Sequence, residues 1–166
     1  MPAYDRGGFD CGTPALNDYL QKHATQDEKR NLTRVFVLVE DHKNIVGYFT
    51  LSQYAVKPSS IPDRLGKKLP PNRDVPCTLL GRLAVNLGYK GQGYGRDLLY
   101  YAVRRTAEAN DNIASYGLVV DAKDQSAKSF YEKFGFSAFT DDDMRLIMPM
   151  KEIRSFIKLW EQDAPR

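Results

Sequence analysis

The sequence predicts a single α/β domain, spanning residues 1–166, with one mixed central sheet and helices on its faces. Strand-like and helix-like segments alternate along the chain, and a glycine-rich loop stands between one strand and one helix. No repeat or linker divides the 166 residues. A chain of this length suits one domain and buries about two thirds of its surface on folding.

The composition indicates a soluble globular protein, with 42% hydrophobic and 27% charged residues. The sequence has no run of about 18 apolar residues and no apolar signal core at its N-terminus, so we expect a cytoplasmic protein without a membrane partner. The net charge of +3 is too small to indicate nucleic-acid binding by itself.

The two cysteines, Cys11 and Cys77, lie far apart in the sequence and have no metal-ligand spacing. The two histidines, His23 and His42, are near neither cysteine. We expect reduced thiols, with a disulfide as the alternative, and no metal site.

The first helix is predicted to begin where Thr13 can act as N-cap and Pro14 fits the first helical position. It is expected to fade in the polar run at residues 25–31. Its apolar face is predicted to consist of Ala15, Leu16, Tyr19, Leu20 and His23.

Two β-prone runs follow, at residues 34–40 and 45–54, and the polar segment 41–44 between them predicts an antiparallel hairpin. Residues 57–76 carry five prolines and are expected to form a long loop. Within it, residues 61–69 are compatible with a short helix. Loops of this length in compact domains are usually functional or mobile.

The central stretch, residues 78–101, predicts a strand at 78–85, a loop at 88–95 and a helix from Arg96. The loop has four glycines in eight residues. Glycines let the backbone turn tightly and approach a ligand, and a helix N-terminus favours negative charge. The arrangement therefore predicts a site for a phosphate-bearing ligand, although glycine-rich strand-to-helix turns also occur without ligands.

Two common phosphate motifs do not match this loop. A Walker motif requires Gly-Lys-Ser/Thr where the chain has Gly95-Arg96-Asp97. The dinucleotide pattern G-x-G-x-x-G is met only by Gly91 and Gly93.

The C-terminal half predicts a strand at residues 115–122 and then a helix that Asp124 caps and Gly135 ends. Two closing strands are expected at 136–139 and 144–150. The tail, residues 151–166, has helical spacing between Ile153 and Trp160.

Two motifs resemble signatures of the GNAT N-acetyltransferases. The segment Lys90-Gly91-Gln92-Gly93-Tyr94-Gly95 resembles the family's R/Q-x-x-G-x-G/A loop, which holds the pyrophosphate of acetyl-coenzyme A (acetyl-CoA). It departs at Lys90, where the family has Arg or Gln. The segment from Asp124 through Tyr131 to Phe136 resembles N-x-x-A-x-x-F-Y-x-x-x-G-F, with Asp124 where many members have Asn.

Three pieces together are similar to the GNAT toxins of type II toxin–antitoxin modules, the TacT and AtaT group. These are the segments Phe9 to Leu16 together with Tyr19-Leu20, Leu80 to Val85, and Ser129 to Phe136. The resemblance implies acetyl transfer to the α-amine of aminoacyl-tRNA, which blocks translation, and neutralisation by a ribbon-helix-helix antitoxin. A homodimer is left open. One departure is that only eight residues precede Phe9, which leaves little room for the family's usual first strand.

The resemblance also implies a set of site residues. Tyr131 is placed at the family's catalytic tyrosine, and a phenol near its ordinary pKa of about 10 stays protonated at pH 7 and can protonate a thiolate. The alternative is an aromatic residue packed beside Phe130 and Phe134. Acetyl-CoA contacts are expected from Leu83, Ala84, Val85, Lys90, Gly91, Gln92, Gly93, Tyr94, Gly95, Arg96 and Asp124.

No carboxylate or histidine stands out as a general base. An α-amine titrates near pH 7.7–8.0 and lysine near 10.4, so this absence favours an α-amine acceptor. Cations expected to contact tRNA phosphates are Arg64, Lys67, Lys68, Arg73 and Arg82. Two alternatives remain open from sequence, namely a GNAT enzyme that acetylates a small amine or a protein amine, and a non-catalytic acyl-CoA-binding module.

Overall fold

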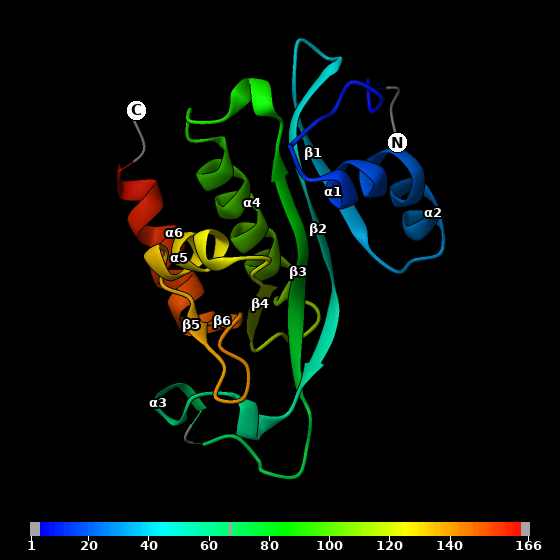
Figure 1. The fold of residues 1–166 in the computed structure, drawn as a ribbon. Coiled ribbons are helices and arrows are strands. Elements are labelled where there is room, and N and C mark those ends of the chain that lie inside the picture. Colours follow the sequence, from blue (N-terminus) through cyan, green and yellow to red (C-terminus); the bar gives the residue numbers. More distant parts are fainter. Residues whose placement is uncertain (1–3, 67, 164–166) are drawn as a thin grey trace. The chain divides into compact units, whose positions relative to one another are not determined.

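The structure is a computed structural model that describes residues 4–66 and 68–163 (Figure 1). In this part of the chain, a mixed six-stranded sheet has the order β1-β2-β3-β4-β6-β5. Contacts divide the chain into two compact units. The first unit comprises residues 1–52 and 81–102, and the second comprises residues 53–80 and 103–166, so β2 and β3 each contribute to both.

The elements that begin in the first unit are α1 (Pro14–Asp18), the π-helical turn η1 (Tyr19–His23), α2 (Ala24–Lys29), β1 (Arg34–Glu40), β2 (Asn44–Val56), the 3₁₀ turn η3 (Leu87–Tyr89) and α4 (Tyr94–Ala109). The predicted hairpin is confirmed, because β1 pairs antiparallel with β2 from Arg34 opposite Leu51 to Glu40 opposite Asn44. The helix after the glycine loop begins at Tyr94, two residues before the predicted start. Asp5 forms an isolated bridge with Asn44.

The first helical segment starts at Pro14 as predicted, but its predicted apolar face is partly wrong. Tyr19 and Leu20 are buried, whereas Ala15 and His23 are exposed and Ala24 is buried instead. The cause is the π-helical turn η1, in which the Ala24 N–H donates to the carbonyl of Tyr19 and so shifts the helical phase by one residue. The helix ends at Lys29, within the polar run where it was predicted to fade.

The predicted capping by the Thr13 side chain is also wrong, because that side chain makes no capping hydrogen bond. The backbone carbonyl of Thr13 instead accepts hydrogen bonds from the N–H groups of Leu16 and Asn17. The start of the helix therefore depends on Pro14 and on these backbone bonds.

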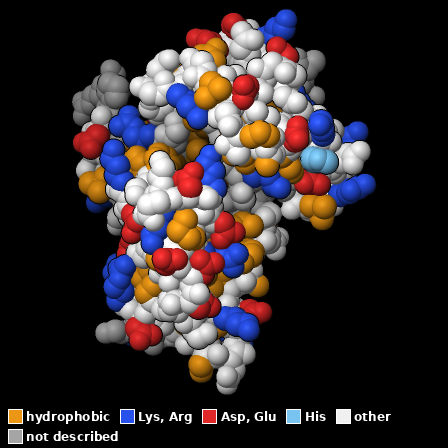
Figure 2. All heavy atoms as spheres, viewed as in Figure 1, with side chains coloured by type: hydrophobic (Ala, Val, Ile, Leu, Met, Phe, Trp, Pro, Cys, Tyr) orange, Lys and Arg blue, Asp and Glu red, His pale blue; other side chains and the backbone are white. Residues whose placement is uncertain are grey.

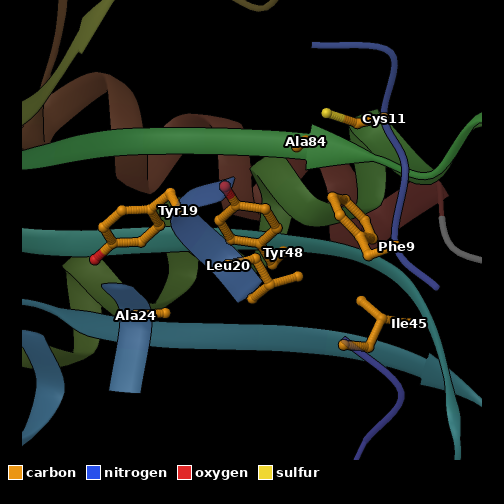
Figure 3. Close-up of a cluster of buried hydrophobic side chains, with 8 residues drawn as sticks. All are labelled: Phe9, Cys11, Tyr19, Leu20, Ala24, Ile45, Tyr48 and Ala84. Carbon is orange, nitrogen blue, oxygen red and sulfur yellow. The ribbon is translucent and has the colours of Figure 1, made fainter. Parts of the chain in front are cut away.

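One buried cluster forms the core of the first unit (Figure 3). Its members come from the segment before α1, from the helical segment and from β2 and β3, and they are Phe9, Cys11, Tyr19, Leu20, Ala24, Ile45, Tyr48 and Ala84. The Tyr48 hydroxyl donates to the carbonyl of Leu16 at 2.7 Å, which satisfies the polar end of a ring buried in this core. The N-terminal segment is thus packed onto the sheet.

The remaining elements are the 3₁₀ turn η2 (Pro58–Ser60), α3 (Asp63–Gly66), β3 (Val75–Val85), β4 (Gly117–Asp121), α5 (Gln125–Lys133), β5 (Ser137–Ala138), β6 (Arg145–Pro149) and α6 (Met150–Asp163). Strand β3 is parallel to β4 from Thr78 opposite Leu118 to Leu80 opposite Val120. Strand β6 is antiparallel to both β4 and β5. The predicted order of strands and helices in this half, including the helical tail, is confirmed.

Within the predicted long loop, the short helix covers Asp63–Gly66 instead of residues 61–69. Cys11 and Cys77 are both free, as predicted, and both are buried. The described residues contain no cluster of histidine, cysteine or carboxylate side chains that could hold a metal ion. None of the helices in the described ranges is long and apolar enough to cross a membrane.

Candidate active site

The loop between β3 and α4 turns at two glycines in the left-handed backbone region. Gly91 and Gly93 have φ values of 78° and 87°, which side-chain-bearing residues rarely adopt. A Cβ atom built on either glycine would meet no atom within 4 Å. The turn therefore requires glycine at both positions, and the space beside each of them is open.

The N-terminal segment holds the start of this loop. The Leu87 N–H donates to the carbonyl of Asp10 at 2.8 Å, and the Lys90 ammonium donates to the carbonyl of Cys11 at 2.9 Å. The Asp10 carboxylate in turn accepts hydrogen bonds from the Gly12 N–H at 2.9 Å and from Asn17 Nδ2 at 3.0 Å. These two bonds lower the pKa of Asp10, and the bond from the Gly12 N–H has the larger effect.

Strand β1 anchors the same loop through Tyr89. Its hydroxyl donates to the Glu40 carboxylate at 2.6 Å, and this bond to an anion is the main cause that raises the pKa of Tyr89 to about 12. The Tyr89 ring meets the ring of Tyr94 edge to face, with centroids 5.9 Å apart. Contacts from the N-terminal segment and from strand β1 therefore both hold the glycine loop in place.

The other predicted cofactor residues of the first unit lie at the end of β3 and the start of α4. Ala84 is buried in the core, whereas Leu83 and Val85 are half-buried. Gly47 lets the neighbouring backbone approach this segment, because a Cβ atom there would lie 2.7 Å from the carbonyl oxygen of Ala84. Gln92, Gly95 and Arg96 belong to the loop or to the first turn of α4.

Tyr131 lies on α5, in the second unit, and its ring is buried against Phe130 and Phe136 at centroid distances of 5.2 and 5.4 Å. Burial raises the pKa of this phenol. The residue keeps 8% of its surface exposed. Within the described ranges the hydroxyl has no hydrogen-bond partner, yet no fully buried side-chain oxygen there is left unpaired. The hydroxyl oxygen therefore reaches solvent while the ring stays packed.

Asp124 caps α5, because its carboxylate accepts a hydrogen bond from the Ala127 N–H at 2.8 Å. The predicted cap is confirmed. The helix ends at Lys133, followed by Gly135 with a φ of 101°. These two signals hold Tyr131 on a helix with defined ends.

The predicted tRNA-contacting cations are divided between the two units. Arg64 donates to Ser137 Oγ at 2.6 Å, and Lys68 and Arg73 are exposed, all three in the second unit. Lys67 lies outside the described residues. Arg82 belongs to the first unit, and its guanidinium carbon lies 3.4 Å from the ring centroid of Tyr19. Figure 2 shows basic and acidic side chains interspersed over the face in view.

The structure also contains polar groups that the sequence did not single out. A cavity of about 420 Å³ in the second unit is lined by residues that include Tyr54, Phe139, Asp141 and Arg145. The Arg145 guanidinium pairs with the Asp121 carboxylate at 2.7 Å and lies over the Tyr54 ring. These residues come from separate strands and loops, so no sequence spacing indicated their proximity.

Comparisons with known proteins agree with this architecture. Residues 6–136 match the family model described as acetyltransferase (GNAT) family. The chain is 34% identical over 155 residues to a tRNA-acetylating toxin of Mycobacterium tuberculosis, a match that covers 93% of this chain and 92% of the toxin.

Two solved structures extend the comparison. AtaT complexed with acetyl-methionyl-tRNAfMet is 29% identical with a TM-score of 0.86, and the match covers 93% of each chain. A tyrosine-to-phenylalanine mutant of AtaT, bound to the C-terminus of the antitoxin AtaR and to acetyl-CoA, is 26% identical with a TM-score of 0.80. That match covers 95% of this chain and 92% of the mutant. The chain belongs to the acetyltransferase (GNAT) family.

Proposed function

We propose that this protein is a toxin that transfers the acetyl group of acetyl-CoA to the α-amine of an aminoacyl-tRNA and thereby blocks translation. The observation that carries the proposal is the open glycine loop at Gly91 and Gly93, in a chain that is 34% identical over 93% of its length to a tRNA-acetylating toxin. The AtaT complexes with acetyl-methionyl-tRNAfMet and with acetyl-CoA support both substrates.

Acetyl-CoA supplies an activated thioester, so the protein has to bind and orient it. The backbone amides from Lys90 to Gly95, with Arg96 at the first turn of α4, hold the diphosphate. The backbone of Leu83, Ala84 and Val85 binds the pantetheine and polarises the thioester carbonyl. Asp124 is assigned to the same cofactor, although one of its carboxylate oxygens already caps α5.

Tyr131 acts as the acid. The neutral α-amine attacks the carbonyl carbon, a C–N bond forms, and the C–S bond breaks to release a thiolate. The phenol gives its proton to this sulfur and regains one from the amine nitrogen through solvent. Burial of the ring raises the pKa of Tyr131, so the proton is present at pH 7 when the thiolate forms.

We also propose that residues 1–166 act as one catalytic domain, because the family model spans segments of both units. The complex of AtaT with AtaR supports an antitoxin partner for this chain, which we assign to the ribbon-helix-helix type. Because the proposed acceptor is charged tRNA, we assign the protein to the cytoplasm. The phosphates of the tRNA are assigned to Arg64, Lys67, Lys68, Arg73 and Arg82.

The deciding experiment incubates the protein with acetyl-labelled CoA and a full set of charged tRNAs, then identifies the labelled amino acid. Label on one or a few aminoacyl-tRNAs, and its loss in Tyr131→Phe, is the expected result. Label on small amines or protein amines with none on tRNA supports the broader GNAT alternative. If the protein transfers acetyl to no acceptor, the proposed enzymatic activity is contradicted and the acyl-CoA-binding module is the interpretation that remains. Growth arrest on expression of the wild-type chain, lost in Tyr131→Phe, is the matching test in cells.

A further inference from the structure

The Arg82 side chain packs on an aromatic ring of the first unit. Its guanidinium carbon lies 3.4 Å from the centre of the Tyr19 ring, which is the spacing of two planar groups in face-to-face contact. An edge-on guanidinium at this distance would drive its N–H groups into the ring. Arg82 is half-buried, and its contact with the Tyr19 ring covers one face of the guanidinium.

The ring beneath Arg82 is fixed on several sides. The Tyr19 hydroxyl donates to the Asp27 carboxylate at 3.0 Å, and the ring stacks on Tyr48 with centroids 6.4 Å apart. Tyr48 is itself tied to the carbonyl of Leu16 and meets Phe9 edge to face. Figure 3 shows the Tyr19 and Tyr48 rings beside each other in the core cluster. Arg82 thus rests on a rigid aromatic base.

Stacking leaves the in-plane donors of the guanidinium for a ligand. Arginine has five N–H groups in a planar fork, and contact through its face occupies none of them. Among the described residues, no carboxylate or carbonyl accepts a hydrogen bond from Arg82. Arg34 of the same unit differs, because it donates to Asn31 and to the carbonyl of Glu28.

We propose that Arg82 and Tyr19 form a phosphate-binding clamp for the acceptor strand of the tRNA, and this proposal rests on the proposed function. Arg82 binds a phosphate through its fork, and Tyr19 is the positioning residue that holds the fork in one orientation. A phosphodiester matches this fork with two parallel N–H···O bonds. Arg82 also lies in β3 directly before Leu83–Val85, so a phosphate bound there lies next to the segment assigned to the thioester.

The competing interpretation is that Arg82 only covers the Tyr19 ring and has a structural role. Arg82→Met separates the two, because methionine keeps an unbranched apolar cover over the ring and removes the donors. Arg82→Lys keeps the charge and loses the planar fork. Tyr19→Phe keeps the ring and loses the bond to Asp27. Arg104→Ala, which removes an arginine paired with Glu108, is the matched control for loss of one exposed charge.

The experiment measures kcat and KM for charged tRNA at several salt concentrations, together with the Kd for acetyl-CoA and the melting temperature of each variant. We expect Arg82→Met to raise KM for charged tRNA about tenfold, with melting temperature and acetyl-CoA Kd unchanged. The slope of log KM against the logarithm of the salt concentration should decrease by about 0.7, the value for one phosphate contact on a single strand. Arg82→Lys should retain that slope with a KM severalfold higher. Tyr19→Phe, whose ring is no longer tied to Asp27, should raise KM for charged tRNA less than Arg82→Met does and should keep the slope.

Three outcomes overturn the clamp, and they are distinguishable. If the wild-type protein acetylates charged tRNA and Arg82→Met keeps its KM and salt slope, the clamp is wrong and the proposed function stands. If the wild-type protein transfers no acetyl group to any tRNA, the proposed function fails and the clamp fails with it. An equal loss in Arg104→Ala also overturns the clamp, because it would reduce the effect to overall charge.

Discussion

The ammonium of Lys90 donates a hydrogen bond to the backbone carbonyl of Cys11 at 2.9 Å, across 79 positions of sequence. This bond joins the glycine loop to the N-terminal segment, two regions that the sequence singled out as separate motifs. Lys90 occupies the first position of the loop motif and is one of the residues expected to contact acetyl-CoA. It also fastens the loop to the segment that Asp10 orders.

Replacing Asp10 tests this linkage. In Asp10→Ala, the Gly12 N–H and the Asn17 amide lose their acceptor, so the segment that holds Leu87 and Lys90 should loosen. With each net hydrogen bond contributing about 1 kcal/mol, we expect the Kd for acetyl-CoA to rise roughly fivefold or more, with a smaller change in kcat. Titration calorimetry measures the effect, and Asp18→Ala, at an exposed ion pair with Lys22, is the control. Equal affinities in the two variants would show that the segment does not support the loop.

Gly93→Ala tests the open space in the loop. The φ of 87° is strained for alanine, which costs roughly 1–2 kcal/mol of folding stability. The added methyl group would also project into the space assigned to the diphosphate, so acetyl-CoA binding should weaken by more than the stability change accounts for. Chemical denaturation and acetyl-CoA titration separate these effects. Gly88→Ala, at a glycine without positive φ, should change little, and normal cofactor affinity in Gly93→Ala would place the diphosphate elsewhere.

Tyr131→Phe tests the acid. The phenol has no hydrogen-bond partner within the described ranges, so its removal should leave folding and acetyl-CoA affinity near wild type. Turnover with charged tRNA should fall by roughly 10²–10⁴-fold. In the wild-type protein, activity should rise with pH as the α-amine deprotonates and stay high to at least about pH 10, because burial raises the pKa of Tyr131 above its ordinary value. Near-normal turnover of the variant would remove Tyr131 from the mechanism.

Because of the buried thiol of Cys77, we expect the folded protein to lose stability at alkaline pH. Burial raises the pKa of its thiol from 9.0 to about 12, so between these values the unfolded chain releases a proton that the folded chain keeps. The stabilisation is fully present below pH 9 and is lost as the pH rises toward 12. Denaturant midpoints of the wild type and of Cys77→Ala, compared at pH 8 and pH 10, measure it. The wild type should lose more stability than the variant over this interval, and parallel curves would contradict the prediction.

Several elements were determined by the sequence alone because their signals are local. Asp124 and Gly135 lie at the two ends of α5, and a cap and a left-handed residue act within one turn of helix. The hairpin of β1 and β2 follows from two β-prone runs and a short polar turn. The fold class and the glycine loop were predictable for the same reason, since both depend on the order of neighbouring segments.

Tertiary structure decided the features that join distant segments. The π-helical turn at Tyr19–His23 changed which residues face the core, and no local propensity marks where a helix shifts phase to fit its sheet. The bond from Lys90 to Cys11 and the contact of Arg82 with Tyr19 join residues that only the folded backbone brings together. The sequence by itself therefore determined which local elements form and which chemical groups they carry. Only packing decided which of those groups meet, because contacts between segments far apart in the chain depend on the whole core.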